Sequence, residues 1–186
     1  MKTGQLVYVA DPMCSWCWGF SPVIDSIRDH FGSDLPVRLL LGGLRPGTTE
    51  AMDDADKAMI REHWEHVQER TGQPFDFKFF DRDGFVYDTE PPSRAIIAAR
   101  HRESETAFSL FKRIQQAFYA ENRDVTDRDL LCDLAAESGM NREEFADLFD
   151  SEDIRQKTLD DYAAARRAGV NGFPALIAGS ESEGYE

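Results

Sequence analysis

The stretch QLVYVADPMCSWCWGF, residues 5–20, joins a short apolar run to two cysteines that lie three residues apart. Residues 5–10 are rich in β-forming side chains, which is typical of a strand buried on both faces. Asp11-Pro12 ends that strand, because proline has no N–H for a sheet ladder and restricts the residue before it. From Cys14 to about Phe31, apolar residues recur every three or four positions, which predicts a helix.

The chain around this stretch predicts an α/β fold with a long helical segment. A second buried strand is expected at Val37–Leu41, which completes a strand–helix–strand unit with two parallel strands. Pro22 lies inside the helix, so we expect a kink and a carbonyl at Trp18 that lacks its usual donor. Residues 49–168 are helical in pattern almost throughout, and Ala175–Ala178 then indicates a third strand.

Turn and cap residues divide the helical segment. Ser93, after Pro91-Pro92, is a candidate N-cap, and Asn141 with Glu144 resembles a capping box. Thr126 precedes a further helix, and the last one is expected to end near Gly169. No flexible linker flanks this block, so we expect it to pack on the sheet.

Charge and composition limit the classes of function. The formal net charge is −14, and the acidic residues are spread over the helical segments, which argues against a nucleic-acid or anionic-membrane partner. No stretch approaches the roughly 20 apolar residues that span a bilayer. Residues 1–10 lack the pattern of a secretory signal, so we expect a cytoplasmic protein. Three cysteines do not indicate a disulfide framework.

Cys14 and Cys17 lie where a buried strand gives way to a helix. A thiol at a helix N-terminus meets unpaired N–H groups and the positive end of the macrodipole, so it ionises more readily. Cys17 is one turn further on, where its sulfur can close a small ring with that of Cys14. The pair is therefore predicted to be redox-active, with Cys14 attacking a disulfide and Cys17 resolving the mixed disulfide.

Two alternatives to a redox pair remain open, namely two buried structural cysteines and half of a zinc site. Zinc needs about four ligands, and no second ligand pair lies close in sequence to the first. His63 and His66 share a helix face, for which a solvated surface is the simpler interpretation. Cys132 is expected to be a half-buried structural cysteine. We expect no metal site and no cofactor.

The run Cys-Ser-Trp-Cys-Trp-Gly-Phe-Ser-Pro, residues 14–22, resembles the DsbA family of the thioredoxin-like fold, and especially its cytoplasmic FrnE-like branch of protein-disulfide isomerases. Residues 42–44 and 169–174 extend the resemblance over most of the chain. It implies a thioredoxin-like domain at residues 1–48 and 169–186 that carries a large all-helical insertion at 49–168. The family's fold continues with a further strand and a terminal helix, and we find no such helix before Glu186, so the domain looks incomplete.

The resemblance also implies the site. Pro174 matches the family's cis-proline, so Phe173-Pro174 is expected to pack against the two cysteines and to pair with an extended substrate; an ordinary trans proline is the alternative. The candidate catalytic residues are Cys14, Cys17 and Pro174. The candidate substrate-binding residues are Ser15, Trp16 and Phe173. An apolar docking surface or simple core packing is open for Trp18, Phe20 and Leu44, and Arg45 either meets an anionic substrate or is an exposed loop residue.

The function predicted is that of a thiol–disulfide oxidoreductase or isomerase that acts on protein or peptide disulfides. Its partners would be protein or peptide thiols and disulfides, with glutathione as a further thiol. One alternative is a glutathione-dependent transferase or isomerase of the same fold, against which the second cysteine argues. Another is a non-enzymatic, redox-sensing adaptor that binds a protein when the pair is oxidised. The sequence leaves the direction of exchange open.

Overall fold

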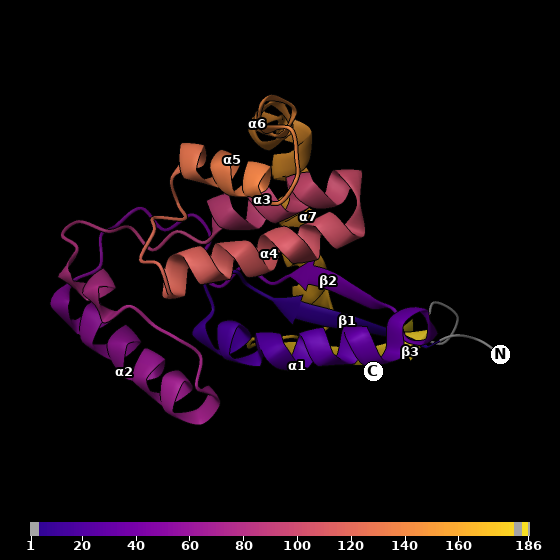
Figure 1. Ribbon diagram of the computed structural model, residues 1–186, viewed down its shortest axis with the longest axis horizontal. Coiled ribbons are helices and arrows are strands. Elements are labelled where there is room, and N and C mark those ends of the chain that lie inside the picture. Colours follow the sequence, from indigo (N-terminus) through magenta and orange to yellow (C-terminus); the bar gives the residue numbers. More distant parts are fainter. Residues whose placement is uncertain (1–3, 181–183, 186) are drawn as a thin grey trace.

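A four-stranded mixed sheet forms the base of the molecule in the computed structural model, which describes residues 4–180 and 184–185 (Figure 1). The strands are β1 (Gln5–Ala10), β2 (Val37–Leu41), β3 (Ala175–Ser180) and β4 (Gly184–Tyr185), in the order β2-β1-β3-β4. β1 and β2 are parallel, and β3 is antiparallel to both of its neighbours. The predicted strand–helix–strand unit and the return to the sheet are confirmed, and β4 supplies the further strand that the resemblance implies.

Helices make up most of the rest of the described chain. They are α1 (Ser15–Phe31), η1 (Gly32–Asp34), α2 (Asp54–Thr71), η2 (Phe77–Asp81), α3 (Glu90–Arg102), α4 (Ser104–Tyr119), α5 (Arg128–Glu137), α6 (Arg142–Asp150) and α7 (Glu152–Arg167). In Figure 1, α3 to α7 are stacked above the sheet and α2 projects from the end where α1 begins. The helical insertion is thus confirmed, while its exact limits at residues 49 and 168 stay a prediction. Among the helices described, none is long and apolar enough to cross a bilayer.

The alternation of side chains along β1 explains its continuous apolar sequence. Tyr8 and Ala10 point into the main core, which lies between the sheet and the helices α1 and α4. Val7 and Val9 point to the other face, where they pack with Ala165 of α7. Because both faces are covered, every residue of the second half of the strand is buried, as in parallel sheets.

The expected start of one helix is wrong by about one turn. Ser93 is buried inside α3, and Thr89 is the residue at its N-cap position. Pro91 and Pro92 lie in the first turn, where the missing N–H of a proline leaves no intrahelical bond unmade. Thr126 precedes α5 as expected, and Asp127 is the residue that caps this helix, since its carboxylate accepts the backbone N–H of Leu130 at 2.8 Å.

The capping box at Asn141 is half formed. The Asn141 side chain accepts the backbone N–H groups of Glu143 and Glu144 at 3.0 Å each. The Glu144 carboxylate pairs with Arg102 of α3 instead of turning back to the cap. Asn141 therefore begins α6, and the glutamate links α6 to α3.

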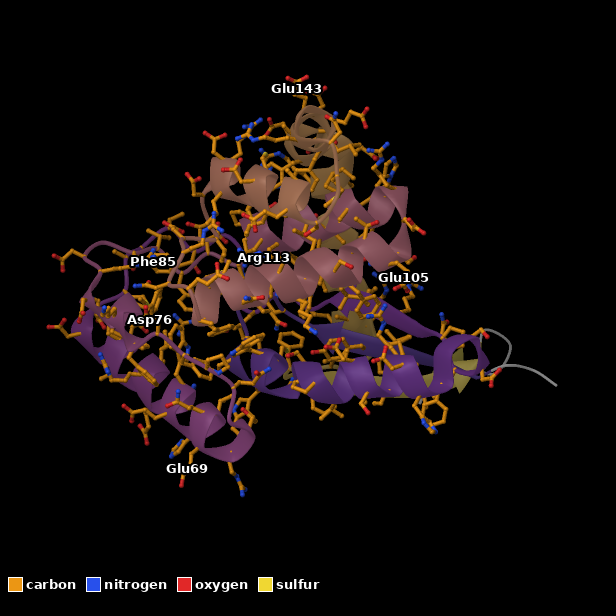
Figure 2. All side chains as sticks on the ribbon, in the orientation of Figure 1. Glu69, Asp76, Phe85, Glu105, Arg113 and Glu143 are labelled. Atoms are coloured by element: carbon orange, nitrogen blue, oxygen red, sulfur yellow. The ribbon has the colours of Figure 1, made fainter. Side chains whose placement is uncertain are left out.

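Acidic side chains cover the outer surfaces of the helices. Figure 2 shows Glu69 of α2 and Glu143 of α6 projecting away from the molecule, and both are exposed. Some carboxylates are paired, as where Arg113 of α4 meets Glu137 of α5 and Glu121 of the loop after α4. The negative charge is thus carried by the surface of the helical block.

Candidate redox site

Cys14 is the N-cap of α1. Its backbone is extended, and its sulfur accepts the backbone N–H of Cys17 at 3.4 Å. The thiol donates to the carbonyl oxygen of Phe173, with the two atoms 3.5 Å apart. Strand β1 delivers the cysteine to this position, because the strand ends at Ala10 and the backbone N–H of Cys14 bonds to the Asp11 carbonyl at 3.1 Å. The predicted placement of Cys14 at a helix N-terminus is therefore confirmed.

Cys17 lies one turn into α1 and has no exposed surface, whereas Cys14 retains a small exposed fraction of 6%. The structure holds both as free thiols. Burial raises the pKa of Cys17 well above its usual value, and the neighbouring Cys14 raises it further. Of the two sulfurs, Cys14 is therefore the one that retains contact with solvent, and Cys17 is protected from it.

Phe173 and Pro174 close the site from the strand side. Their peptide bond is cis, and both side chains are half-buried. The Phe173 ring packs against Gly42, where an added Cβ would lie 1.9 Å from a ring carbon. Only a residue without a side chain fits there, so Gly42 sets how closely β2 and the Phe173 loop approach.

Asp11 is fully buried behind the cysteine loop. One carboxylate oxygen accepts the N–H of Met13 at 2.9 Å, and the other accepts the N–H of Leu44 at 2.7 Å. The side chain thus ties the loop before α1 to the loop after β2. Burial raises the pKa of Asp11 to about 6, although the two backbone donors and Thr89 act in the opposite direction.

The remaining aromatic candidates divide between surface and core. Trp16 and Leu44 are exposed large apolar side chains, and Ser15 is half-buried. Trp18 is buried and stacks on Tyr119, with ring planes 8° apart. Core packing therefore applies to Trp18. The Trp18 carbonyl, freed by Pro22 as expected, accepts the side-chain amide of Gln73 at 3.0 Å.

Phe20 also belongs to the core rather than the surface. It is half-buried and packs against Tyr8 at 6.2 Å between ring centroids. Arg45 is half-exposed, lies 5.7 Å from the centre of the Tyr87 ring and faces Asp56 at 3.7 Å. It is thus a loop residue near the site with a weak ion pair of its own.

A family model described as a DSBA-like thioredoxin domain matches residues 5–184. The chain belongs to this family. The match runs from the first strand to the last, so it includes both cysteines, the helical insertion and the Phe173-Pro174 turn.

Other members of the DSBA-like family and their structures resemble the chain to different degrees. A candidate protein disulfide isomerase from Nitrosomonas europaea superposes with a TM-score of 0.91 at 38% identity, over 98% of this chain and 87% of that one. The cytosolic disulfide reductase DsbM from Pseudomonas aeruginosa gives a TM-score of 0.81 at 33% identity, over 96% and 86% of the two chains. That reductase has also been solved with GSH.

Another relative of the chain is named as an adapter protein rather than as a disulfide oxidoreductase. The ClpXP adapter protein SpxH of Bacillus subtilis is 22% identical over 176 residues, which is 94% of this chain. The match spans 58% of the adapter, so this DSBA-like chain covers little more than half the length of that relative.

Buried tyrosines surround the thiols of this DSBA-like domain and were not predicted from the sequence. The Tyr87 hydroxyl donates to the Met13 carbonyl at 2.6 Å. Tyr8 and Tyr119 are fully buried, and in the described structure their hydroxyls have no hydrogen-bond partner. Burial raises the pKa of all three, and Cys14 raises each of them further. The available signal was the alternation of β1, which puts Tyr8 on the same face as α1.

The other candidate ligands lie away from the pair. Cys132 is buried in α5, and that burial raises the pKa of its thiol. It is more deeply buried than expected. His63 and His66 are exposed on α2. Over residues 4–180 and 184–185, no three His, Cys, Asp or Glu side chains are grouped as a metal site.

Proposed function

We propose that this protein exchanges disulfides with protein or peptide substrates through Cys14 and Cys17. The observation that carries the proposal is the position of the Cys14 sulfur, at the start of α1, bonded by the Cys17 N–H and 3.5 Å from the Phe173 carbonyl. Such a sulfur keeps a small exposed surface that a substrate disulfide can reach, and it accepts a hydrogen bond from the Cys17 backbone N–H.

The proposed exchange has two steps. The Cys14 thiolate attacks one sulfur of a substrate disulfide, so that a Cys14–substrate bond forms and the second substrate sulfur leaves as a thiol. Cys17 then loses its proton and attacks Cys14, which forms the Cys14–Cys17 disulfide and releases the first substrate sulfur. The protein is oxidised by two electrons and the substrate is reduced, or the reverse when the cycle begins from the disulfide.

The substrate would lie along the Phe173 loop. In the proposal, Phe173 and Pro174 hold an extended peptide beside Cys14, and the exposed Trp16 gives it an apolar contact. Ser15 is half-buried between the two cysteines and would face the same segment. These four residues are the proposed substrate contacts.

We assign the net direction to reduction, with glutathione as the thiol that regenerates Cys14 and Cys17. The support is the likeness to DsbM at 33% identity, a protein named as a cytosolic disulfide reductase and solved with GSH. A cytoplasmic location fits this direction, because glutathione keeps thiols reduced there. The test is the reduction potential of the pair, expected near the roughly −270 mV of a reductant rather than the roughly −120 mV of a strong oxidant.

An adapter function is the second candidate, favoured by the name of the SpxH relatives. An adapter would bind one protein partner and deliver it without turning over disulfides. The variant Cys17→Ser separates the two, because it cannot resolve the mixed disulfide on Cys14. Covalent capture of many thiol proteins supports the oxidoreductase, whereas capture of one protein, together with negligible reduction of model disulfides by the native chain, supports the adapter.

If the native protein forms no intramolecular disulfide at any glutathione poise, the redox proposal is wrong. Cys14→Ser is the matched control for the capture experiment, since it removes the accessible sulfur and leaves Cys17 buried.

A further inference from the structure

Tyr8 presents a buried polar group next to the redox pair that the disulfide exchange described above does not use. It lies in the middle of β1, and its ring packs against Phe20 and Phe111 with centroids 6.2 Å away in both cases. The side chain has no exposed surface, and within the described residues its hydroxyl has no hydrogen-bond partner. An unpaired buried hydroxyl lowers stability, so its presence calls for a physical reason.

Tyr8 lies beneath the part of α1 that carries Cys17, because its ring packs against Phe20, which is one turn after Cys17 on the same helix face, and because Tyr8 and Cys17 are both fully buried in the main core. Burial raises the pKa of Tyr8 most, followed by the charge of Cys17 and of Cys14 and by a side-chain interaction with Cys17. In the free-thiol state the two groups do not have hydrogen-bond geometry. A negative charge on Cys17 favours the protonated form of the Tyr8 phenol. The interaction is reciprocal, so the protonated phenol also stabilises the Cys17 thiolate.

We propose that Tyr8 is a positioning residue for the second step of the exchange, and that its hydroxyl donates a hydrogen bond to the Cys17 sulfur once that sulfur becomes a thiolate. This inference rests on the proposed function. Cys17 is wholly buried and loses its proton only at the cost of placing a charge in the protein interior. A donor that is already buried and unpaired stabilises that charge without a solvent molecule entering the core.

The chemical balance of the step is unchanged by Tyr8. The Cys17 thiolate attacks the Cys14 sulfur, the Cys14–Cys17 bond forms, the Cys14–substrate bond breaks, and the substrate sulfur leaves with the electron pair and takes up the proton that Cys17 released. Tyr8 keeps its own proton throughout. The other titratable groups around the pair are Cys14, Asp11, Asp25, Tyr87 and Tyr119.

The test is a stopped-flow reaction of the reduced protein with dithiobis(nitrobenzoate), whose thiol product is coloured. The first release reports attack by Cys14 and depends on reagent concentration. The second reports resolution by Cys17 and does not. Tyr8→Phe should leave the first release unchanged and slow the second about tenfold, since a hydrogen bond to a charged group is worth at least that much. The midpoint of the pH dependence of the second step should rise by about one pH unit.

Tyr162→Phe is the matched control. The Tyr162 hydroxyl is also buried without a partner, but neither thiol is among the main groups that shift its pKa. This variant should give both releases at native rates. Cys17→Ser should give the first release alone, which assigns the second one.

Three outcomes overturn the inference and one distinguishes it from the proposed function. Resolution by Tyr8→Phe at the native rate and with the native pH midpoint refutes it. Equal slowing of both releases also refutes it, because that pattern indicates a general packing defect. Slowing of the second release by Tyr162→Phe to the same extent refutes it as well. If the native protein shows no second release at all, Cys17 does not resolve the mixed disulfide, and the proposed function itself is wrong.

Discussion

Replacing Gly42 by alanine should disturb the redox site through a single steric clash. Gly42 is buried directly after β2, where its N–H bonds to the Ala10 carbonyl at 2.9 Å. A Cβ at this position would lie 1.9, 2.1 and 2.8 Å from three carbons of the Phe173 ring. Ordinary contact begins at 3.4 Å, so the ring must move by roughly 1.5 Å.

The size of the effect follows from where Phe173 is held. Its ring packs on both apolar clusters, and its carbonyl oxygen is 3.5 Å from the Cys14 sulfur. Overpacking of this kind costs about 1–3 kcal/mol, which for a chain of this length lowers Tm by about 2–12 °C. A displacement of about 1 Å in a substrate-positioning residue slows a reaction by up to about a hundredfold, so we expect disulfide exchange to slow by about ten- to a hundredfold.

Gly172→Ala is the matched control in the same loop. Nothing lies within 4 Å of a Cβ at Gly172, and its φ is not in the left-handed region. The free energy of unfolding of this variant should lie within about 1 kcal/mol of the native value. Its rate of disulfide exchange should be native. The measurements are thermal unfolding by circular dichroism and reduction of a peptide disulfide. If Gly42→Ala matches Gly172→Ala in both, the contact between Gly42 and Phe173 does not position the site.

Two further perturbations test the buried carboxylates. Burial raises the pKa of Asp11 to about 6, against about 3.9 in an unfolded chain. Protonated Asp11 therefore adds stability that is complete below about pH 4 and is lost as the pH rises through 6. The total loss in the free energy of unfolding is about 3 kcal/mol. Asp11→Asn should flatten the free energy of urea unfolding over that window, and an unaltered pH profile would assign the slope to other groups. Asp161 is buried, accepts the Leu41 N–H at 3.0 Å and pairs with Arg100 at 2.7 Å. Asp161→Ala should therefore cost about 3–5 kcal/mol, and a loss below about 1 kcal/mol in urea unfolding would show that the pair behaves like a surface ion pair.

Local sequence patterns were sufficient for the elements near the site. The apolar runs at β1 and β2 and the periodicity of α1 depend on neighbours within a few residues, so the strand–helix–strand unit was predictable. The error at α3 arose where two candidate capping residues lie close together in the sequence. Thr89, Ser93, Thr126 and Asp127 can all cap a helix, and which of them does so depends on how the helix packs.

The site was predictable only in part, for a related reason. Cys14 and Cys17 lie three residues apart, and this spacing was enough to identify them as a candidate redox pair. The partners of the loop between β1 and α1 lie far along the chain, as with Leu44 for Asp11 and Tyr87 for Met13. Contacts of this kind follow from the tertiary packing of segments that lie far apart in the chain, which no local sequence pattern encodes.

The first turn of α1 depends on the helical insertion as much as on the sheet. Pro22 removes the normal donor for the Trp18 carbonyl, and Gln73, which follows α2, replaces it. The Trp18 indole N–H donates in turn to the Pro74 carbonyl at 3.1 Å. A proline that would weaken an isolated helix is therefore accommodated because the insertion supplies the missing bond. A partner that displaced α2 would therefore alter the hydrogen bonds of Trp18, the residue that follows Cys17 in the first turn of α1.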